Sequence, residues 1–425
     1  MFIHRYPDKK SWKELLKRPV FDTGQLEASV RSVFSEVMAD GDDAVKKFTV
    51  RFDGVNLDQL AVTEEEIIAA GKNISQALAD AIKLAAANIR AFHEKQLQQP
   101  EKMETMPGIV CWRKNSAIER VGLYIPGGTA PLFSTVLMLA IPATIAGCKE
   151  IILCTPPSKD GSIHPAILFA ARYTGVTKIY KAGGVQAIAA MSLGTASIPK
   201  VAKIFGPGNQ YVMAAKQFAQ QMGIAIDMPA GPSEVAVFGD ETANPVFVAA
   251  DLLSQAEHGP DSQAILVTDH EPLVALVQEA LSSQSAVLPR RSIAEKALVN
   301  SKIILVASKE EAMELLNEYA PEHLILSCKD PLSLSESIVN AGSVFLGHYS
   351  PESAGDYASG TNHTLPTNGY ATAYSGVSVD SFVKKITFQQ LSKQGLQHIG
   401  AAVTIMAEAE GLHAHANAIT VRLAE

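Results

Sequence analysis

The spacing of apolar residues predicts that the first hundred residues are mainly helical. Apolar side chains recur every three or four positions over residues 25–40 and again over residues 75–96, which is the period of an amphipathic helix. The Asp53-Gly54 pair between these stretches has the composition of a turn. Few strand signals precede Ala117, so we expect a helical N-terminal segment.

From Ala117 onward, short β-rich runs alternate with helical patterns. A first series has predicted strands at 121–125, 151–154, 178–180 and 203–205, with helices at 132–146 and 165–173. A second series has predicted strands at 234–238, 264–268, 303–306, 324–326 and 344–346, with helices at 244–256 and 273–282. Strands that alternate with helices favour βαβ units and therefore parallel sheets. Gly/Pro-rich junctions at 206–208 and 230–232 lie near the division between the series, which favours two separate sheets.

We therefore predict an α/β fold with two Rossmann-like parallel-sheet domains, a helical N-terminal segment and a small C-terminal helical tail. The expected parts are an N-terminal arm (1–22), a discontinuous first α/β domain (23–120 plus 236–377), a second α/β domain (121–235) and a C-terminal tail (378–425). Residues 362–379, rich in Thr, Gly, Ser and Tyr, have the composition of a long loop. Long loops in compact chains are usually functional or linkers.

Composition and charge exclude several classes of protein. Of the 425 residues, 47% are hydrophobic and 19% are charged, which is typical of a globular chain. The net charge of -8 argues against nucleic acid or an anionic membrane as the main partner, because neutralising phosphates requires clustered Lys and Arg. The most apolar stretch, 133–147, is short for a membrane span and contains Pro142.

The N-terminus and the cysteines indicate the expected compartment. No apolar run follows the charges of the first ten residues, and the four cysteines form no Cys-x-x-Cys pair. A secretory signal and a disulfide framework are both disfavoured. We expect a cytoplasmic protein with reduced thiols.

Histidines gather in the second half of the chain, where eight of the eleven follow residue 200. Gln255 and His258 lie three positions apart near the end of a predicted helix, so both side chains project from one face and could bind one ion. The alternative is an ordinary helix end, with His258 interacting with the helix dipole near Gly259.

A Glu-His dipeptide, Glu322-His323, separates a predicted helix from a predicted strand. The pair is either catalytic or a surface pair. In a parallel sheet this position lies at the amino-terminal edge, whereas ligands usually bind at the carboxyl-terminal edge. Neighbouring strand residues also face opposite ways, so both side chains can act together only if the backbone there is irregular.

Two further polar stretches carry candidate ligands. Residues 350–363 combine small residues, which let the backbone approach a ligand, with Glu352, Asp356, Tyr357 and His363. Near the C-terminus stand Glu410, His413 and His415, which are otherwise a polar tail. A set of imidazole and oxygen donors without thiolate suits Zn, Mn, Fe or Co and excludes a Cys-type structural zinc site. The sequence contains no His-Glu-x-x-His motif of the zinc proteases.

Two Gly-rich turns precede these candidates. Residues 124–131 follow a predicted strand and open a helix, and residues 205–209 do likewise. Backbone amides at such a place can face a phosphate. Neither turn is Gly-x-Gly-x-x-Gly, and no Walker lysine follows. The residues therefore indicate an anionic or nucleotide ligand without identifying NAD.

Taken together, seven motifs in order resemble the histidinol dehydrogenase family, and the resemblance runs across nearly the whole chain. The motifs are Val121 to Gly128, Ala182 to Ala187, Gly206 to Asn209, Ala230 to Glu234, Gln255 to His258, Pro321 to Leu324 and Gly355 to His363.

The resemblance implies the cofactors and the residues that bind them. One zinc ion per subunit is expected on Gln255, His258, Asp356 and His415, whereas His413 is not required. The implied contacts with substrate are Ser233, Gln255, His258, Glu322, His323, Asp356, Tyr357, His363, Glu410 and His415. NAD is expected to contact Tyr124, Gln186 and Asn209, with Pro126 and Gly127 lining the approach. The family's tail reaches the partner subunit, so Glu410 and His415 would complete the neighbour's site in a homodimer.

The implied reaction takes L-histidinol to L-histidine through L-histidinal with two NAD, the last step of histidine biosynthesis. A histidine is suited to remove the hydroxyl proton, and we assign this to His323. A carboxylate can activate the water that hydrates the aldehyde, and we assign this to Glu322. Three alternatives are a zinc hydrolase using Glu322 and a metal-bound water, a catalytically silent metal-dependent binding protein, and a dehydrogenase of another amino alcohol. The silent relative predicts loss of Glu322 or His323, and both are present.

Overall fold

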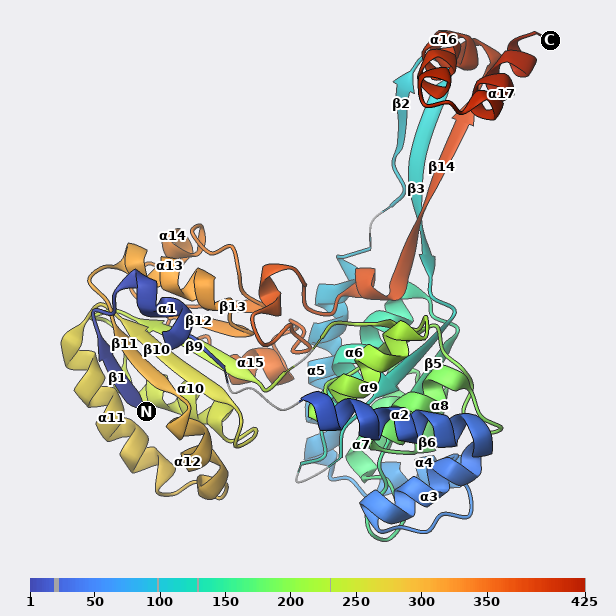
Figure 1. Ribbon diagram of the computed structural model, residues 1–425. Helices are drawn as coiled ribbons and strands as arrows, with labels where there is room; N and C mark the ends of the chain where they lie inside the picture. Colours follow the sequence, from blue (N-terminus) through green and yellow to red (C-terminus); the bar gives the residue numbers. More distant parts are fainter. Residues whose placement is uncertain (19–22, 98, 128–129, 230, 425) are drawn as a thin grey trace.

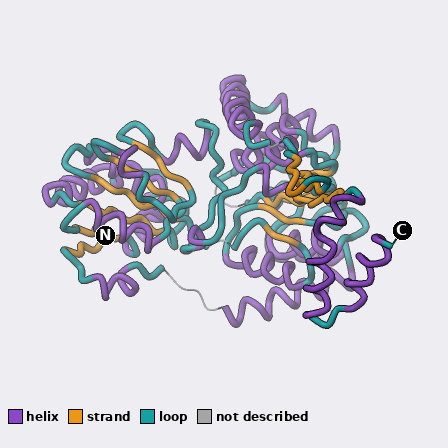
Figure 2. Tube along the Cα trace, turned by 90° about the horizontal axis from the view of Figure 1, so that it is seen from above, coloured by secondary structure: helices purple, strands orange, loops and turns teal. Residues whose placement is uncertain are grey.

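Two α/β lobes lie side by side, and a narrow arm projects from one of them (Figure 1). The computed structural model describes residues 1–18, 23–97, 99–127, 130–229 and 231–424. Seen from above, helices flank the strands of both lobes (Figure 2). Among the described residues, no helix is long and apolar enough to cross a membrane.

The first βα series forms a five-stranded parallel sheet, which defines the five-stranded lobe. Its order is β6-β5-β4-β7-β8. The strands are β4 (Arg120–Tyr124), β5 (Glu150–Thr155), β6 (Lys178–Lys181), β7 (Lys203–Phe205) and β8 (Ala225–Ile226). The helices between them are α6 (Phe133–Ala146), α7 (Pro165–Thr174), α8 (Gly184–Leu193) and α9 (Gln210–Gln221). The chain runs outward from β4 in one direction and then restarts at β7 on its other side, so the carboxyl ends of β4 and β7 form a topological switch point.

The second series forms a six-stranded parallel sheet, which defines the six-stranded lobe. Its order is β1-β11-β10-β9-β12-β13. The strands are β1 (Phe2–Arg5), β9 (Glu234–Gly239), β10 (Gln263–Thr268), β11 (Lys302–Leu305), β12 (His323–Ser327) and β13 (Ser343–Leu346). The helices are α1 (Trp12–Leu15), α10 (Pro245–Ala256), α11 (Glu271–Ser285), α12 (Arg291–Val299), α13 (Lys309–Tyr319), α14 (Pro331–Ser335) and α15 (Glu352–Tyr357). The predicted strands and helices of both series are confirmed to within a few residues.

Alternation along each strand fills a core on both faces of the six-stranded sheet. Val235 and Val237 pack against α10, α11 and α12, whereas Ala236 and Phe238 pack against α1 and α13. A strand buried on both faces is a continuous apolar run, as expected for a parallel sheet covered by helices.

The N-terminal helices pack on a different sheet from the one expected. The helices are α2 (Thr23–Asp40), α3 (Asp42–Asp53), α4 (Glu64–Lys72) and α5 (Gln76–Glu94). Val33 and Phe48 share a core with α8, and Ile82 and Ile89 share one with α6. Residues 23–94 therefore belong with 121–226, and the expected grouping of 23–120 with 236–377 is wrong. Sequence periodicity gives each helix an apolar face but does not say which sheet that face covers.

The expected N-terminal arm and helical tail also need correction. The described part of the expected arm, residues 1–18, is not separate, because β1 pairs with β11 at the edge of the six-stranded sheet; residues 19–22 lie outside the described residues. The C-terminal tail begins with a strand, β14 (Val383–Leu391), before α16 (Lys393–Ala409) and α17 (His413–Leu423). β14 pairs antiparallel with β3 (Ile109–Ala117), which pairs with β2 (Lys102–Met106). These three strands and two helices form the projecting arm (Figure 1).

Short 3-10 turns complete the described elements at Lys9–Ser11, Tyr370–Thr372 and Val379–Phe382. The predicted loop 362–379 is confirmed as largely irregular. It leads from the six-stranded lobe to Phe382, which is buried in the core of the five-stranded lobe.

Gly206, just after β7, lies where a side chain cannot fit. Its φ is +130°, and an added Cβ would stand 2.1 Å from the backbone oxygen of Tyr124. Gly223, after α9, also has positive φ (+85°), but its Cβ would meet open space. We expect Gly223→Ala to cost about 1 kcal/mol of unfolding free energy from backbone strain alone.

Gly206→Ala should cost about 3 kcal/mol or more, because backbone strain and overpacking add. Urea unfolding of the two variants measures the difference. Equal losses for the two variants would show that the contact with Tyr124 relaxes without cost.

Candidate active site

A cavity of about 400 Å³ lies between the lobes and takes residues from both. We call it the inter-lobe cavity. From the five-stranded lobe it is lined by Tyr124, Pro126, Gly127 and Asn209, which follow the carboxyl ends of β4 and β7. From the six-stranded lobe it is lined by Ser233, His258, Glu322, His323, Asp356, Tyr357 and His363. The amino-terminal edge of one sheet therefore faces the carboxyl-terminal edge of the other.

The Glu322-His323 pair is held by the backbone of one residue, Glu234, at the start of the neighbouring strand. The Glu234 N–H donates to Glu322 Oε2 at 2.9 Å, and His323 Nδ1 lies 3.1 Å from the Glu234 carbonyl oxygen. A carbonyl can only accept, so Nδ1 carries the proton and the neutral ring leaves Nε2 as its base. The side chains of Glu322 and His323 are therefore held beside the same residue, although neighbours in a regular strand would point to opposite faces of the sheet.

The backbone before Glu322 is irregular, which is the condition for both side chains of the pair to lie together. Ala320, which ends α13, has φ +50°, a left-handed conformation rare outside glycine. Pro321 follows, and β12 begins only at His323. Such a conformation persists only where the surroundings hold it, and it is common at functional sites.

Burial and neighbouring charges set the protonation of the pair. Burial raises the pKa of Glu322 to about 8, although the charge of His323 opposes the shift. Burial lowers the pKa of His323, but the carboxylates of Glu352, Glu322 and Asp356 outweigh it and raise the pKa well above its usual value. Carboxyl and imidazole groups with shifted pKa values in a cavity are typical of acid-base catalysts.

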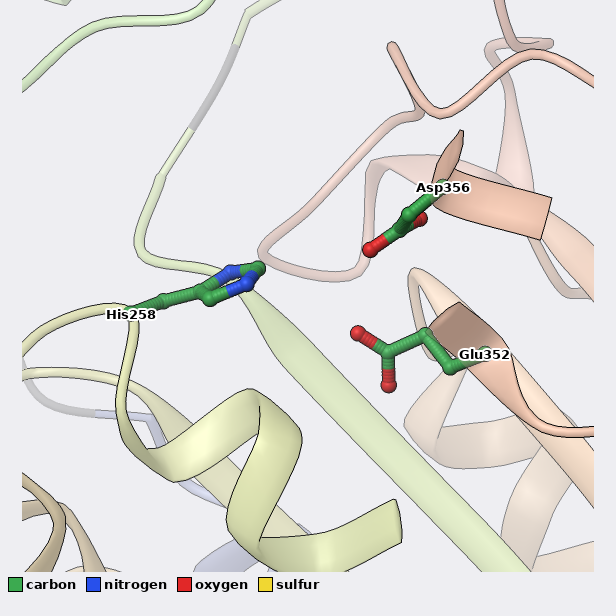
Figure 3. Close-up of side chains that lie close together, drawn as sticks. All are labelled: His258, Glu352 and Asp356. Atoms are coloured by element: carbon green, nitrogen blue, oxygen red, sulfur yellow. The ribbon is translucent and has the colours of Figure 1, made fainter. Parts of the chain in front are cut away.

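Three potential metal ligands converge beside the pair (Figure 3). His258, just after α10, and Glu352 and Asp356, both on α15, place one ligand atom each within 4.8 Å of one another. Gln255 adjoins them, with Nε2 3.2 Å from His258 Nδ1. The structure thus brings Gln255, His258 and Asp356 together, as predicted for a metal site.

Unpaired oxygens show that a cation fits this cluster. Gln255 Oε1, Asp356 Oδ1 and both Glu352 oxygens are buried and have no hydrogen-bond partner among the described residues. A buried oxygen without a donor costs free energy. A divalent ion would satisfy these atoms together, and an imidazole with oxygen donors suits zinc.

Glu352 is a candidate ligand of the polar stretch 350–363, but it is not among the zinc and substrate contacts that the family resemblance implies. Its side chain is 1% exposed, and Oε1 lies 3.9 Å from His323 Nδ1. The acidic residue after Pro351 resembles an ordinary acid in the first turn of a helix. Only its burial among His258, His323 and Asp356 distinguishes it, and sequence spacing does not give that.

Arg18 and Glu234 were also missed, and they support the pair from behind. Arg18 Nε donates to Glu234 Oε1 at 2.5 Å, and Nη2 donates to Oε2 at 2.8 Å. Arg18 also donates to the Tyr319 carbonyl oxygen at 2.6 Å and stacks over the Tyr319 ring. The Asn368 N–H donates to Glu234 Oε1 at 2.6 Å. The N-terminal segment and loop 362–379 thus meet at the residue whose backbone holds Glu322 and His323.

The other predicted residues of the cavity differ in their hydrogen bonds and in their exposure. His363 Nδ1 lies 2.9 Å from the Asp356 carbonyl oxygen and Nε2 lies 3.1 Å from Thr135 Oγ1, so both ring nitrogens are engaged. Tyr357 is half exposed at the cavity. Ser233 immediately precedes β9.

A second, larger cavity of about 1040 Å³ adjoins the first. It shares Tyr124, Pro126, Gly127 and Asn209 with the inter-lobe cavity and adds Gln186. Tyr124 Oη accepts from the Gly184 N–H at 3.0 Å. Gln186 is 1% exposed, and its Oε1 has no hydrogen-bond partner among the described residues. The five predicted NAD contacts therefore line one cavity at the switch point, with an unused acceptor. Gly128, Thr129 and Ala230 of the sequence motifs lie outside the described residues.

The structure does not bring Glu410 and His415 to the cavity of their own chain. Glu410 ends α16 and His415 lies in α17, both exposed at the far end of the arm (Figure 1). Neither residue lines either cavity.

Comparisons with known proteins agree with one another. The family model described as histidinol dehydrogenase matches residues 16–423. A Bacteroides fragilis protein named histidinol dehydrogenase is 63% identical over 425 residues, which is 100% of this chain and 99% of the relative. One from Xanthomonas campestris is 53% identical over 96% of each chain. The crystal structure of histidinol dehydrogenase from Elizabethkingia anophelis superposes with a TM-score of 0.98 at 54% identity, covering 100% of this chain and 98% of that one.

The buried Arg18–Glu234 pair predicts a large stability effect. Replacing Arg18 by Gln leaves the carboxylate of Glu234 buried without its cation, which should cost about 3–5 kcal/mol of unfolding free energy. The control is Arg5→Gln, because Arg5 and Glu271 form an exposed pair whose loss should cost less than about 1 kcal/mol. Urea unfolding measures both, and a similar small loss for both variants would contradict the role assigned to Arg18.

Proposed function

Because the chain belongs to the histidinol dehydrogenase family, we propose that it oxidises L-histidinol to L-histidine through L-histidinal, using two NAD. This is the last step of histidine biosynthesis. The observation that carries the proposal is the Glu322-His323 pair, which faces a cavity adjoining the second one at the switch point. The reaction needs a base at the hydroxyl group and a hydride acceptor at the carbon that carries it. Two adjoining cavities can hold both.

The first oxidation removes a hydroxyl proton and a hydride from the alcohol carbon. His323 Nε2 is the base in the neutral ring, since Nδ1 is committed to the Glu234 carbonyl. The carboxylates of Glu352, Glu322 and Asp356 raise the pKa of His323, and a cation held by Glu352 and Asp356 would offset their charge. The imidazolium that forms is stabilised by Asp356, whose Oδ1 lies 3.4 Å from Nε2. NAD, when bound, accepts the hydride.

The aldehyde must then gain water before the second oxidation. Glu322 is the base for this step in its ionised form. Burial raises its pKa to about 8, whereas the charge of His323 and the hydrogen bond from the Glu234 N–H favour the carboxylate. The hydrate carries a hydroxyl whose proton His323 can again remove, after it has released the first. A second hydride leaves to a second NAD, and the product is the carboxylate of L-histidine.

Gln255, His258 and Asp356 of one chain hold a zinc ion, and the unpaired oxygens of this cluster support the proposal. The ion supplies chiefly orientation, by binding the amino group and an imidazole nitrogen of the substrate. Ser233, Tyr357 and His363 line the same cavity and complete the substrate contacts.

NAD occupies the second cavity. Tyr124, Gln186 and Asn209 contact it, with Pro126 and Gly127 lining the passage to the substrate. The position fits the rule that nucleotides bind at the carboxyl edge of a parallel sheet at its switch point. The buried, unpartnered Gln186 Oε1 supplies an acceptor for a ligand donor.

The functional unit is a homodimer with shared sites. Glu410 and His415 lie at the end of the arm, away from the cavity of their own chain (Figure 1). Placed in a partner's cavity, His415 adds a fourth zinc ligand and Glu410 a substrate contact. All four cysteines are free thiols, which agrees with a cytoplasmic location.

A zinc hydrolase using Glu322 and a metal-bound water is the runner-up. It explains the metal cluster but leaves the larger cavity, with its unused Gln186 acceptor, without a role. Incubating the zinc-loaded protein with L-histidinol and NAD separates the two. Two NADH formed per histidine support the proposal, and absence of turnover contradicts it.

The assignment of separate roles predicts a split between half-reactions. Glu322→Gln should spare oxidation of L-histidinol to the aldehyde far more than net formation of histidine, because only hydration loses its base. Loss of a general base typically costs about 10²–10⁴-fold in the step it serves. Single-turnover NADH formation and histidine yield measure the two rates. An equal loss of both rates would contradict the separate roles of Glu322 and His323.

Sharing of the site predicts complementation between inactive variants. His323→Asn and His415→Asn should each be inactive alone. Co-expressed, they form mixed dimers with one intact site, and random pairing should restore about a quarter of wild-type activity. The control pairs His323→Asn with Asp356→Asn, where both lesions lie in a chain's own cavity and recovery is not expected. No recovery in the first pair would place His415 in its own chain's site.

A further inference from the structure

Glu352 is a buried acid that the proposed mechanism leaves unused. It stands in the first turn of α15, and both carboxylate oxygens lack a hydrogen-bond partner among the described residues. Two other buried acids near the site have partners: Glu322 accepts from the Glu234 N–H, and Glu234 accepts from Arg18. A carboxylate buried without a donor or a cation is strongly unfavourable.

His323 does not satisfy Glu352. The distance from Glu352 Oε1 to His323 Nδ1 is 3.9 Å, beyond a hydrogen bond. The Nδ1 proton is already directed at the Glu234 carbonyl oxygen, 3.1 Å away. The imidazole therefore lies near Glu352 without bonding to it.

The unpaired oxygens of Glu352 instead belong to the metal cluster. One of its oxygens lies within 4.8 Å of the ligand atoms of His258 and Asp356, and the three side chains point into one space (Figure 3). Glu352 and Asp356 are four positions apart on α15, so they share one helical face. A single cation between the three would neutralise both acids.

We propose that Glu352 is a further ligand of the metal, holding the ion with Gln255, His258 and Asp356 while the cavity contains no substrate. Each chain then carries four donors of its own, and His415 of the partner subunit adds to a site that already retains metal. This inference rests on the proposed function, which supplies the ion.

Substrate binding then competes with Glu352. L-histidinol offers two nitrogen donors, an amine and an imidazole, and a site already surrounded by protein donors must release one to accept them. Glu352 is the donor to be released, and its Oε1 already lies 3.9 Å from His323 Nδ1.

Zinc affinity tests the proposal without relying on activity. Competition with a chromophoric chelator gives the affinity of wild type, Glu352→Gln and Glu257→Gln in the absence of substrate. Glu257→Gln is the control, because it removes one negative charge next to His258 without removing a proposed ligand. Glu257 directly follows the last residue of α10. Losing a residue that only supports a metal ligand weakens metal binding about 10–100-fold, so Glu352→Gln should weaken zinc binding at least about tenfold and Glu257→Gln much less. Equal affinity of wild type and Glu352→Gln overturns the proposal.

The His415→Asn variant gives a second readout. It should still bind one zinc per subunit, whereas His415→Asn with Glu352→Gln should lose most of it. In cobalt-substituted wild type, adding L-histidinol should change the visible spectrum, and the substrate-free spectrum of Glu352→Gln should already differ from that of wild type. Identical substrate-free spectra overturn the proposal. If wild type binds no metal at all, the proposed zinc site fails as well, which separates the two failures.

Discussion

The backbone of Glu234, the first residue of β9, holds the two groups on which the proposed chemistry depends. Its N–H bonds to Glu322 and its carbonyl to His323, so one rigid strand end sets the direction of both side chains and the tautomer of the imidazole. The Glu234 side chain is in turn fixed by Arg18 and by the Asn368 N–H. Segments from three distant parts of the chain thus converge to keep one backbone position in place.

The two sheets face each other with opposite edges, which explains why the site includes residues from an amino-terminal edge. Ligands of parallel sheets bind at carboxyl edges, and the larger cavity follows this rule on the five-stranded sheet. The acid-base pair lies at the amino edge of the six-stranded sheet, where the left-handed Ala320 turns the chain into β12. In the proposed mechanism, the five-stranded lobe binds the cofactor and the six-stranded lobe supplies the acid-base groups, so both lobes are needed for the reaction.

Local periodicity predicted most of the fold, because the strands of both parallel sheets are apolar on both faces and bounded by turns. It missed the short strands β1 and β8 and the arm strands β2, β3 and β14. The residues of β2 and β14 are largely exposed and those of β3 mostly half-buried, so the arm lacks the apolar pattern of a core strand. It also assigned the N-terminal helices to the wrong sheet, since packing partners are a property of the whole chain. At the site, the motifs located Gln255, His258, Glu322, His323 and Asp356. Arg18 and Glu234 were missed because their roles come from contacts across hundreds of residues. Glu352 was a candidate ligand without an assigned role, because only its burial places it in the cluster.

The central claim is that a metal ion binds at the cluster of unpaired oxygens beside His323. Anomalous X-ray diffraction at the zinc absorption edge, from crystals of the dimer purified without chelator, tests it directly. We expect one strong peak per subunit between Gln255, His258 and Asp356, with His415 of the partner subunit against it. A map without a peak among these side chains, from protein that oxidises L-histidinol, would contradict the claim.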